Sequence, residues 1–263
     1  MNQKPKVVWI TGASSGIGAE LAKQYSAIGV KLILSARSTG LLNEVKAQCI
    51  NPENIKILPF DLTDFKAAPE RVKSANDLFG KVDILINNAG VSQRSLIIDS
   101  VFDVYQKLTE VNYLGHVALS NAILPYFIKQ GGGSFAVVSS VMGKYGSPYR
   151  SGYAGAKHAL HGFFDVMRME HQRDNVNVTM ICPGFVKTPI SKNALTGDGT
   201  PLKKYDKANL RGLAVELISK KIIRAIHQKK WEVSFGGKER LGVYLKRLSN
   251  KLLHSLVIRS SVR

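Results

Sequence analysis

Short apolar runs alternate with stretches of helical periodicity along the whole of this 263-residue chain. The runs lie at residues 7–10, 32–34, 55–58, 82–86, 135–138, 176–181 and 231–235. Runs of this length, bounded by polar or glycine-containing segments, are typical of buried strands. The segments between them place apolar residues at helical spacing, as at positions 17, 21, 25 and 28. Alternation of strands and helices predicts an α/β fold, with a doubly wound parallel sheet flanked by helices.

The length of the chain fits one α/β domain that is large enough to bury a sizeable core. No Pro/Ser-rich linker, repeat or low-complexity tract marks a second domain. We therefore assign residues 1–237 to a single domain and residues 238–263 to a C-terminal extension.

The sequence shows no sign of export or of a membrane span. No apolar run reaches the roughly 18 residues that a span requires. Residues 1–6 lead into the first strand without an apolar signal-peptide core. Cys49 and Cys182 lie far apart in sequence and are expected to be buried, reduced thiols. These features predict a cytoplasmic protein.

The chain is strongly basic, with 37 Lys and Arg residues against 19 Asp and Glu residues and a formal net charge of +18. Residues 219–263 contribute +10 of this charge, from 12 basic and two acidic residues. Apolar residues at 241, 244, 245, 248, 252 and 256 predict a basic amphipathic helix over about residues 240–258. Such a helix can pack on the domain, lie on an anionic membrane surface or bind an acidic partner. Nucleic-acid binding is not predicted, because the basic residues lack an aromatic stacking platform.

A glycine-rich segment, TGASSGIG at residues 11–18, lies between the first strand and the first helix. A helix N-terminus at such a turn offers unpaired N–H groups and the positive end of the helix dipole, which together bind phosphate. Glycines permit the tight turn and the close approach of the backbone to a pyrophosphate. The alternative is a glycine-rich turn without a ligand. The expected dinucleotide contacts are Gly12, Ser14, Ser15, Gly16, Ile17 and Gly18.

Tyr153 and Lys157 lie four residues apart in a predicted helix and therefore share one face. A free tyrosine has a pKa of about 10. The neighbouring ammonium is expected to lower that pKa towards the range of efficient general acid–base catalysis. Ser140 follows the run at 135–138, so its hydroxyl is expected at the carboxyl end of a strand, where open α/β sheets bind ligands. Alternation along the strand would turn Ser139 away.

Six motifs, in their order along the chain, resemble those of the short-chain dehydrogenase/reductase superfamily in its single-domain, NAD(P)-binding form. The motifs are Thr11 to Gly18; Asp61-Leu62; Asn87-Asn88-Ala89-Gly90; Asn112; Ser140 with Tyr153 and Lys157; and Pro183-Gly184 with Thr188. The resemblance extends from about residue 6 to about residue 236 and implies a Rossmann-like fold. Within the superfamily, residues 91–96 and 112–115 resemble the dehydrogenase/reductase member 7 branch.

The resemblance implies catalytic roles for Asn112, Ser140, Tyr153 and Lys157. Hydride would pass between a nicotinamide and the substrate carbon, while Tyr153 gives a proton to the substrate oxygen or takes one from it. Lys157 would lower the pKa of Tyr153 and hold the nicotinamide ribose, and Ser140 would orient the substrate oxygen. Asn112 would anchor a water that relays protons from Lys157 to solvent.

The turn after the second strand favours NADP(H) over NAD(H). A dinucleotide fold that prefers NAD places an acidic residue there to bind the ribose 2′-hydroxyl. This chain instead has Arg37, whose planar and permanently charged fork suits a phosphate, and Ser38, which adds a hydroxyl donor. The alternative is that Arg37 stacks on the adenine, as in some NAD-dependent relatives.

By resemblance, three further groups of residues would line the cofactor. They are Asp61 and Leu62 at the adenine; Asn88, Ala89 and Gly90 at the ribose; and Pro183, Gly184, Val186 and Thr188 at the carboxamide side of the nicotinamide. No metal site is predicted, because the histidines at 116, 158, 161 and 171 lack a second ligand at suitable spacing.

The sequence therefore predicts an NADP(H)-dependent oxidoreductase that interconverts a carbonyl and a secondary alcohol on a lipophilic substrate. Residues 185–212 are expected to form a flap over the substrate, with lysines at 192, 203, 204 and 207. Those lysines leave a 3-oxoacyl-thioester reductase as one alternative, and a non-catalytic, membrane-associated dinucleotide-binding protein is another. A homodimer or homotetramer is expected by resemblance, and the basic helix adds peripheral contact with a membrane as an alternative location.

Overall fold

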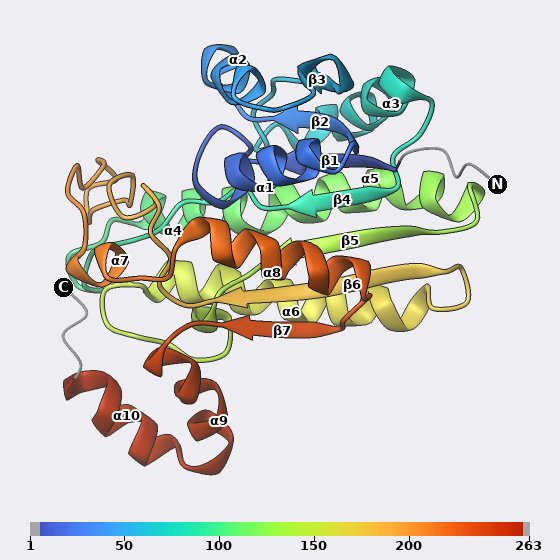
Figure 1. The fold of residues 1–263 in the computed structure, drawn as a ribbon. Coiled ribbons are helices and arrows are strands. Elements are labelled where there is room, and N and C mark those ends of the chain that lie inside the picture. The colour runs from blue at the N-terminus through green and yellow to red at the C-terminus, as the bar shows by residue number, and fades with distance from the viewer. Residues whose placement is uncertain (1–5, 260–263) are drawn as a thin grey trace.

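The computed structural model describes residues 6–259, so the outer ends of the two predicted units, residues 1–5 and 260–263, lie outside the described part. The strands are β1 (Val7–Thr11), β2 (Lys31–Ser35), β3 (Ile55–Ile57), β4 (Ile84–Asn87), β5 (Gly133–Val138), β6 (Val176–Pro183) and β7 (Glu232–Phe235). They form one seven-stranded sheet in the order β3-β2-β1-β4-β5-β6-β7, with parallel pairing throughout (Figure 1). Each strand overlaps a predicted apolar run, with bounds that differ by up to two residues, and the predicted fold class is confirmed.

The strands are apolar at consecutive positions because the sheet is covered on both sides. Val8 and Ile10 of β1 are buried in the core on one face, whereas Trp9 is buried in the core on the other. The same alternation occurs in β2, where Leu32 and Ile33 belong to opposite cores. Successive side chains of a strand point to opposite faces. A parallel sheet between two helical layers therefore requires apolar residues at nearly every position.

Helices form a layer on each face of the sheet (Figure 1). One layer consists of α1 (Gly16–Ala27), α2 (Thr39–Ala47) and α8 (Val215–His227). The other consists of α3 (Ala68–Phe79), α5 (Gly115–Lys129) and α6 (Ser151–Glu170), with α4 (Phe102–Thr109) packed against α6. No helix within residues 6–259 is long and apolar enough to cross a membrane.

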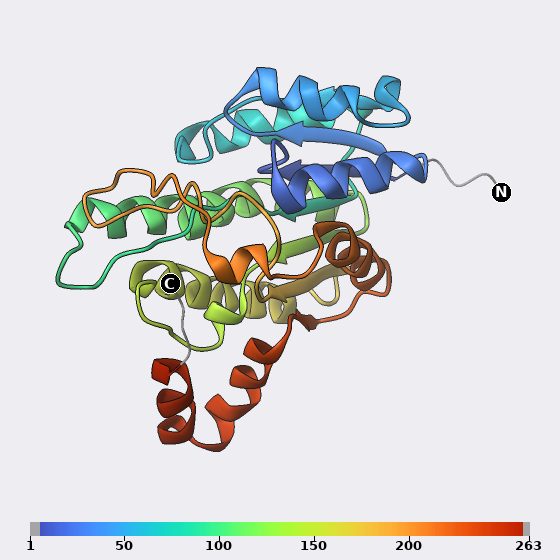
Figure 2. The same cartoon turned by 60° about the vertical axis from the view of Figure 1, so that its left-hand side comes forward.

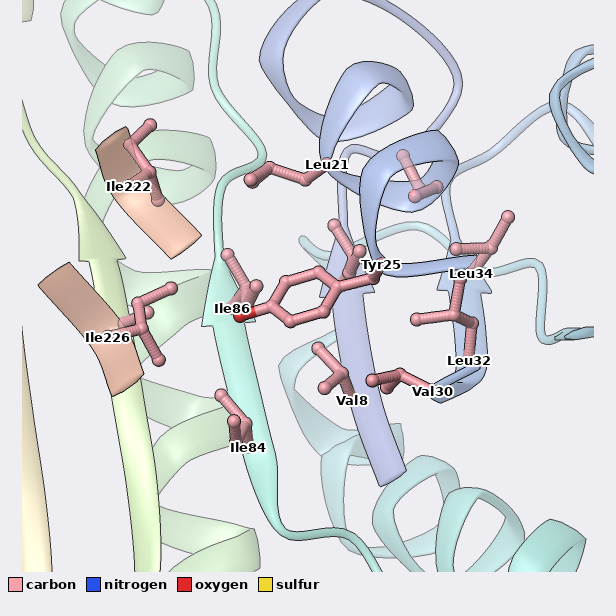
Figure 3. Close-up of a cluster of buried hydrophobic side chains, with 14 of the residues drawn as sticks. Val8, Leu21, Tyr25, Val30, Leu32, Leu34, Ile84, Ile86, Ile222 and Ile226 are labelled. Atoms are coloured by element: carbon pink, nitrogen blue, oxygen red, sulfur yellow. The ribbon is translucent and has the colours of Figure 1, made fainter. Parts of the chain in front are cut away.

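Figure 3 shows how the first layer closes on the sheet. The ring of Tyr25, from α1, lies next to Ile86 of β4, and Ile222 and Ile226 of α8 belong to the same cluster. All four side chains are at most 4 % exposed. Full burial of an aliphatic side chain contributes roughly 1.5–3 kcal/mol. This packing fixes α1, and with it the turn that precedes α1, against the sheet.

All strands end at the same edge of the sheet because they are parallel. The strand order reverses between β1 and β4, since β2 pairs with one side of β1 and β4 pairs with the other. Open α/β sheets form a ligand-binding crevice at such a point. The glycine-rich turn, residues 88–90, Ser140 and Gly184 come directly after β1, β4, β5 and β6, or after them by one residue, so the fold gathers these motifs at this edge.

The C-terminal extension is a helical hairpin, and the prediction of one continuous helix is wrong. Helix α9 (Leu241–Leu248) is followed by α10 (Asn250–Arg259), and the two pack against each other. Ser249 separates them in an extended conformation, and its hydroxyl accepts a hydrogen bond from Leu252 N at 3.2 Å. Figures 1 and 2 show the hairpin projecting from the body of the protein beyond β7, which is an edge strand.

Candidate active site

The carboxyl ends of β1, β4, β5 and β6 open onto one cavity of about 1400 Å³. This volume exceeds the roughly 300–1,000 Å³ of most ligand pockets, so the cavity has room for a dinucleotide and a second molecule. Of the predicted site residues, all except Gly18 and Asn112 line it. The lining members are Gly12, Ser14, Ser15, Gly16, Ile17, Arg37, Ser38, Asp61, Leu62, Asn88, Ala89, Gly90, Ser140, Tyr153, Lys157, Pro183, Gly184, Val186 and Thr188.

The glycine-rich turn forms a close-fitting cradle on one side of this cavity. Gly12 and Gly16 have φ angles of +63° and +55°, in a region that glycine adopts without strain. A Cβ atom on Gly18 would lie 2.3 Å from the carbonyl oxygen of Gly12, so this position also requires glycine. Ser15 precedes α1 without a side-chain capping bond, and the first turn contains no acidic residue. The N-terminus of α1 therefore keeps its attraction for a phosphate group.

Hydrogen bonds join this turn to the segment that follows β4. The hydroxyl of Thr11 donates to Ile86 O at 3.1 Å. The same oxygen accepts from Asn88 N at 3.0 Å and from Ala89 N at 3.2 Å. The amide of Asn88 donates in return to the carbonyl oxygens of Thr11, at 3.0 Å, and Gly12, at 3.2 Å. These bonds fix the two sides of the crevice relative to each other.

Arg37 and Ser38 follow β2 and are exposed, and the Ser38 hydroxyl caps α2. Asp61 lies near Arg37. Its Oδ1 accepts hydrogen bonds from Thr63 N at 2.9 Å and Thr63 Oγ1 at 2.8 Å. Burial acts to raise the pKa of Asp61, but the bonds from Thr63 and the positive charges of Lys107 and Arg37 outweigh it and lower the pKa. An ionised carboxylate and a permanent cation therefore share this end of the cavity.

Ser140, Tyr153 and Lys157 lie together in the cavity wall, with exposed fractions of 7, 8 and 3 %. Lys157 Nζ lies 5.9 Å from the centre of the Tyr153 ring. It donates a hydrogen bond at 2.8 Å to the carbonyl oxygen of Val138, the last residue of β5. The hydroxyl of Ser140 donates to Pro183 O at 3.3 Å. The predicted catalytic serine, tyrosine and lysine are thus brought together by the end of β5 and the first turns of α6.

Burial dominates the protonation of this group. It raises the pKa of Tyr153, and the opposing effects of Ser140, Arg94 and Arg150 do not cancel it. It also lowers the pKa of Lys157 to about 8. The expected lowering of the Tyr153 pKa is not seen: burial outweighs the three groups that act to lower it, and Lys157, 5.9 Å from the ring centre, is not one of them.

Ser139 lies just after β5 and also lines the cavity, but its hydroxyl bonds to α6 and not to Pro183 O, the partner of Ser140. Its hydroxyl donates to Lys157 O at 3.2 Å and forms a hydrogen bond with His161 Nε2 at 3.1 Å. Burial lowers the pKa of His161 to about 4, so this histidine is neutral at physiological pH. The contact ties the end of β5 to α6, the helix that carries the tyrosine and lysine.

Asn112 does not line the cavity and lies in a π-helical turn, Glu110–Leu114, between α4 and α5. Its side chain is fully buried. Its Oδ1 accepts from Val91 N, and its Nδ2 donates to Val91 O, both at 2.8 Å. Short π-helical turns recur at functional sites. Asn112 thus anchors the segment that follows Gly90, and its part in a proton relay stays a prediction.

Gln93, which the sequence analysis did not select as a site residue, holds the N-terminal end of α6. Its side chain is fully buried, and its Oε1 accepts hydrogen bonds from Gly152 N at 2.8 Å and Tyr153 N at 3.3 Å. The first N–H groups of a helix have no partner within the helix. Arg150, at the N-cap position, makes no capping bond, and a loop 59 residues away supplies the cap instead. The sequence does give one indication of such a cap, because position 150 lacks the Ser, Thr, Asp or Asn that usually caps a helix.

A buried ion pair fixes the flap to the body of the protein. Arg94 Nε donates to Asp206 Oδ2 at 2.7 Å, and Arg94 Nη2 contacts the same oxygen. Arg150 Nη2 lies 3.5 Å from that oxygen. These side chains are at most 9 % exposed. Removal of one partner from a buried pair typically costs about 3–5 kcal/mol, so the flap is held firmly at residue 206.

The C-terminal hairpin closes the remaining side of the cavity. The residues that it contributes to the lining are Leu241, Gly242, Leu245, Leu253, Leu256 and Val257. Glu239 holds its base, because Glu239 Oε1 accepts from Phe185 N at 3.0 Å and from Gly237 N at 3.1 Å. The hydroxyl of Tyr145 donates to Glu239 O at 2.7 Å. The sequence analysis missed this wall because it treated the extension as a separate unit.

Cys49 and Cys182 are free and buried, as predicted. Among the residues that the structure describes, no group of three or more His, Cys, Asp and Glu side chains is arranged to hold a metal ion.

Comparison with known proteins defines the family. The short chain dehydrogenase family matches residues 6–198 of this chain. A Drosophila melanogaster dehydrogenase/reductase SDR family protein 7-like is 37% identical over 269 residues, which cover 100% of this chain and 82% of that protein. The Homo sapiens dehydrogenase/reductase SDR family member 7 is 46% identical over 200 residues, which are 74% of this chain and 59% of the human protein.

A solved structure agrees with these relatives. An alcohol dehydrogenase from the archaeon Thermococcus sibiricus, complexed with 5-hydroxy-NADP, matches with a TM-score of 0.75 at 25% identity, over 90% of this chain and 98% of that chain. The chain therefore belongs to the short-chain dehydrogenase/reductase family of oxidoreductases, which bind a nicotinamide dinucleotide. Within it, the similarity places the chain in the dehydrogenase/reductase member 7 branch, as residues 91–96 and 112–115 predicted.

Replacing Lys157 with Met is expected to stabilise the protein while removing its activity. Burial lowers the Lys157 pKa from 10.5 to about 8. Below about pH 8 the folded protein therefore buries a charged ammonium, which has a lower free energy in the unfolded chain, where it is solvated. The variant should gain up to roughly 2 kcal/mol in the free energy of unfolding at about pH 7, because the lost hydrogen bond to Val138 O offsets part of the relief. This gain should shrink as the pH rises from 8 to 10.5, since the folded wild-type lysine then loses its proton first. Urea unfolding across this pH range measures the difference. The exposed Lys56→Met is the control, and a variant less stable than wild type near pH 7 would contradict the expectation.

Replacing Gln93 with Leu is expected to lower both stability and turnover. The change leaves the N–H groups of Gly152 and Tyr153 without their acceptor, which should reduce the free energy of unfolding by about 1–3 kcal/mol. Gln93→Glu keeps the acceptor oxygen and should retain most of the turnover. Urea unfolding and kcat for both variants provide the measurement, and equal turnover in wild type and Gln93→Leu would show that this cap does not position Tyr153.

Proposed function

We propose that the protein is an NADP(H)-dependent oxidoreductase that interconverts a carbonyl and a secondary alcohol on a lipophilic substrate. The observation that carries this proposal is the position of Tyr153 between two parts of one cavity. The first part is lined by the glycine-rich turn, Arg37 and Gly90, and the second part is lined mainly by apolar residues. On one side Tyr153 packs in an apolar cluster with Met142, Tyr145 and Leu253. On the other side, the neighbouring Lys157 lies against Gly90, where an added Cβ atom would be 3.6 Å from Lys157 Nζ.

The residues of the first part fit a nicotinamide dinucleotide. The N-terminus of α1 and the close-packed Gly12 and Gly16 suit a pyrophosphate. Arg37 and Ser38 would hold a ribose 2′-phosphate, because the guanidinium is exposed to the cavity and β2 ends without an acidic residue. The archaeal alcohol dehydrogenase, complexed with 5-hydroxy-NADP, is in keeping with NADP(H). The remaining contacts are those predicted at the adenine, the ribose and the carboxamide.

The chemistry follows from the protonation of Tyr153. When bound, the reduced nicotinamide supplies a hydride to the substrate carbonyl carbon. Tyr153 donates its proton to the substrate oxygen. Burial raises the pKa of Tyr153, so its hydroxyl is protonated before this step. Ser140 donates a hydrogen bond to the same oxygen, and Lys157 stabilises the phenolate that remains. In the reverse reaction the phenolate takes the proton from the substrate hydroxyl, and the hydride passes to the oxidised nicotinamide.

The second part of the cavity favours a lipophilic substrate over an acidic one. Its lining is largely apolar, with Val141, Met142, Leu195, Leu245 and Leu253 among its members. The flap lysines at 192, 203, 204 and 207 are exposed and are not part of the lining. A 3-oxoacyl-thioester reductase, which would use those lysines for an acidic substrate or carrier, therefore has less support.

We also propose that the protein is cytoplasmic and forms a homodimer or homotetramer through α4, α5 and α6. Exposed apolar side chains on these helices support association. Ile128 of α5 is 39 % exposed, and Val166 and Met169 of α6 are 46 % and 68 % exposed.

Replacing Tyr153 with Phe is expected to reduce turnover by roughly two to four orders of magnitude, because the variant lacks the proton donor. NADPH oxidation, followed at about 340 nm, the absorption of reduced nicotinamides, should be measured over ketones, aldehydes, quinones, steroids and 3-oxoacyl thioesters. Tyr126→Phe, at a tyrosine that is 38 % exposed on α5, is the matched control. Turnover that survives in Tyr153→Phe would refute the mechanism, and turnover of thioesters alone would select the alternative reductase.

Replacing Arg37 with Ala is expected to weaken NADPH binding about 10- to 100-fold, because one charge-assisted contact with the 2′-phosphate is lost. Binding of NADH should change much less. Titration calorimetry with both cofactors separates the two roles considered for Arg37. Equal losses for NADPH and NADH would indicate stacking on the adenine and would contradict the preference for NADP(H).

A further inference from the structure

The hairpin of α9 and α10 exposes an unusual number of large apolar side chains. Their exposed fractions range from 47 % for Leu256 to 81 % for Leu248. The full set is Leu241, Tyr244, Leu248, Leu252, Leu256 and Ile258. Single exposed apolar residues are common, but a group of this size on one projecting element marks a surface that contacts something.

The same element carries a concentrated positive charge. Residues 238–259 contain six basic residues and one acidic residue. The basic residues are Lys238, Arg240, Lys246, Arg247, Lys251 and Arg259, all of which are exposed. The one acidic side chain, Glu239, points inward, where it accepts hydrogen bonds from Phe185 N and Gly237 N. The outer surface of the hairpin is therefore both apolar and cationic.

The apolar surface is continuous with the cavity. Leu241 and Leu256 are 59 % and 47 % exposed and also line the cavity. Leu253, by contrast, is 7 % exposed and belongs to the same buried apolar cluster as Tyr153. The hairpin thus presents one face to the active site and the other to the surroundings, and two leucines lie at the border between them.

We infer that the α9–α10 hairpin binds an anionic phospholipid surface and connects the substrate end of the cavity to it. Apolar side chains that enter the headgroup region, together with basic side chains next to acidic headgroups, are the features of an interfacial element. A second copy of the hairpin fits less well, because two surfaces of high positive charge repel each other. The connection to the cavity rests on the proposed lipophilic substrate, whereas the binding to phospholipid does not.

Flotation of the full-length protein with vesicles tests the inference. The vesicles are pure phosphatidylcholine or phosphatidylcholine with about a third phosphatidylserine, each in low and high salt. One variant combines Lys246→Glu, Arg247→Glu and Lys251→Glu, and a second combines Leu248→Ser with Ile258→Ser. The matched control combines Lys56→Glu with Ile50→Ser, two exposed positions in and near β3, at the opposite edge of the sheet. Thermal unfolding of each variant confirms that it is folded.

Wild type and the control should bind the anionic vesicles, and binding should weaken with salt. The charge variant should lose at least about tenfold in binding, since each Lys or Arg near an anionic surface contributes on the order of 1 kcal/mol. The leucine and isoleucine variant should bind more weakly than wild type as well. Equal binding by wild type and both hairpin variants, or no binding to any vesicle, would overturn the inference.

Two further results would also overturn it and would identify another occupant. One is a dimer, seen by light scattering, that both hairpin variants lose without any binding to vesicles. The other is retention on polyglutamate, lost in the charge variant, again without vesicle binding, which would indicate an acidic protein partner.

Turnover separates this inference from the proposed function. A long-chain ketone carried in anionic vesicles should be reduced at least about tenfold more slowly by the charge variant than by wild type. A short, water-soluble ketone should be reduced equally by both. Vesicle binding without turnover of either ketone would leave the membrane contact supported and the proposed enzyme activity refuted. Equal rates on the vesicle-borne ketone would refute the connection between membrane and cavity.

Discussion

The hydroxyl of Thr11 joins the two halves of the sheet at the point where the strand order reverses. It forms hydrogen bonds with three main-chain groups at the end of β4. The side-chain amide of Asn88 donates two further hydrogen bonds to the end of β1 and the turn that follows it. These bonds join the glycine cradle on one side of the crevice to the segment that carries Gly90 on the other. Lys157 of α6 lies against this segment, which forms one wall of the crevice.

Next to this wall the protein holds two ionisable side chains, Tyr153 and Lys157, in a buried and poorly solvated environment. Burial raises the pKa of Tyr153 and lowers that of Lys157, so both groups are held in a site that favours their neutral forms. Helix α6 tolerates this because it is anchored at several points. Gln93 caps its N-terminus, Ser139 bonds to the carbonyl oxygen of Lys157, and Val138 accepts from the Lys157 ammonium. Stability is given up locally to hold the reactive groups in place.

The sequence predicted what depends on short-range pattern. Apolar runs indicated all seven strands, and motif spacing brought Ser140, Tyr153 and Lys157 to one place. It could not show contacts between distant loops, such as the cap that Gln93 provides for α6, because their partners are set by the tertiary fold. The direction of the Tyr153 pKa shift also escaped it, since spacing reveals a nearby charge but not the depth of burial. The helical spacing of apolar residues continues through Ser249, so it did not indicate the break between α9 and α10. Ser249 itself was an indication, because a serine just before a helix is a common cap.

Glu239 makes the attachment of the hairpin independent of the side chains on its outer surface. One carboxylate holds the base of the hairpin by main-chain N–H groups, one of which belongs to the first residue of the flap, and these bonds do not depend on the side chains of α9 or α10. The outer residues of the hairpin can therefore change without disturbing Ser140, Tyr153 and Lys157. If the hairpin contacts a membrane as inferred, location would reside in residues 238–259 and the proposed chemistry in the sheet. Changes confined to those residues would then redirect the protein to another surface.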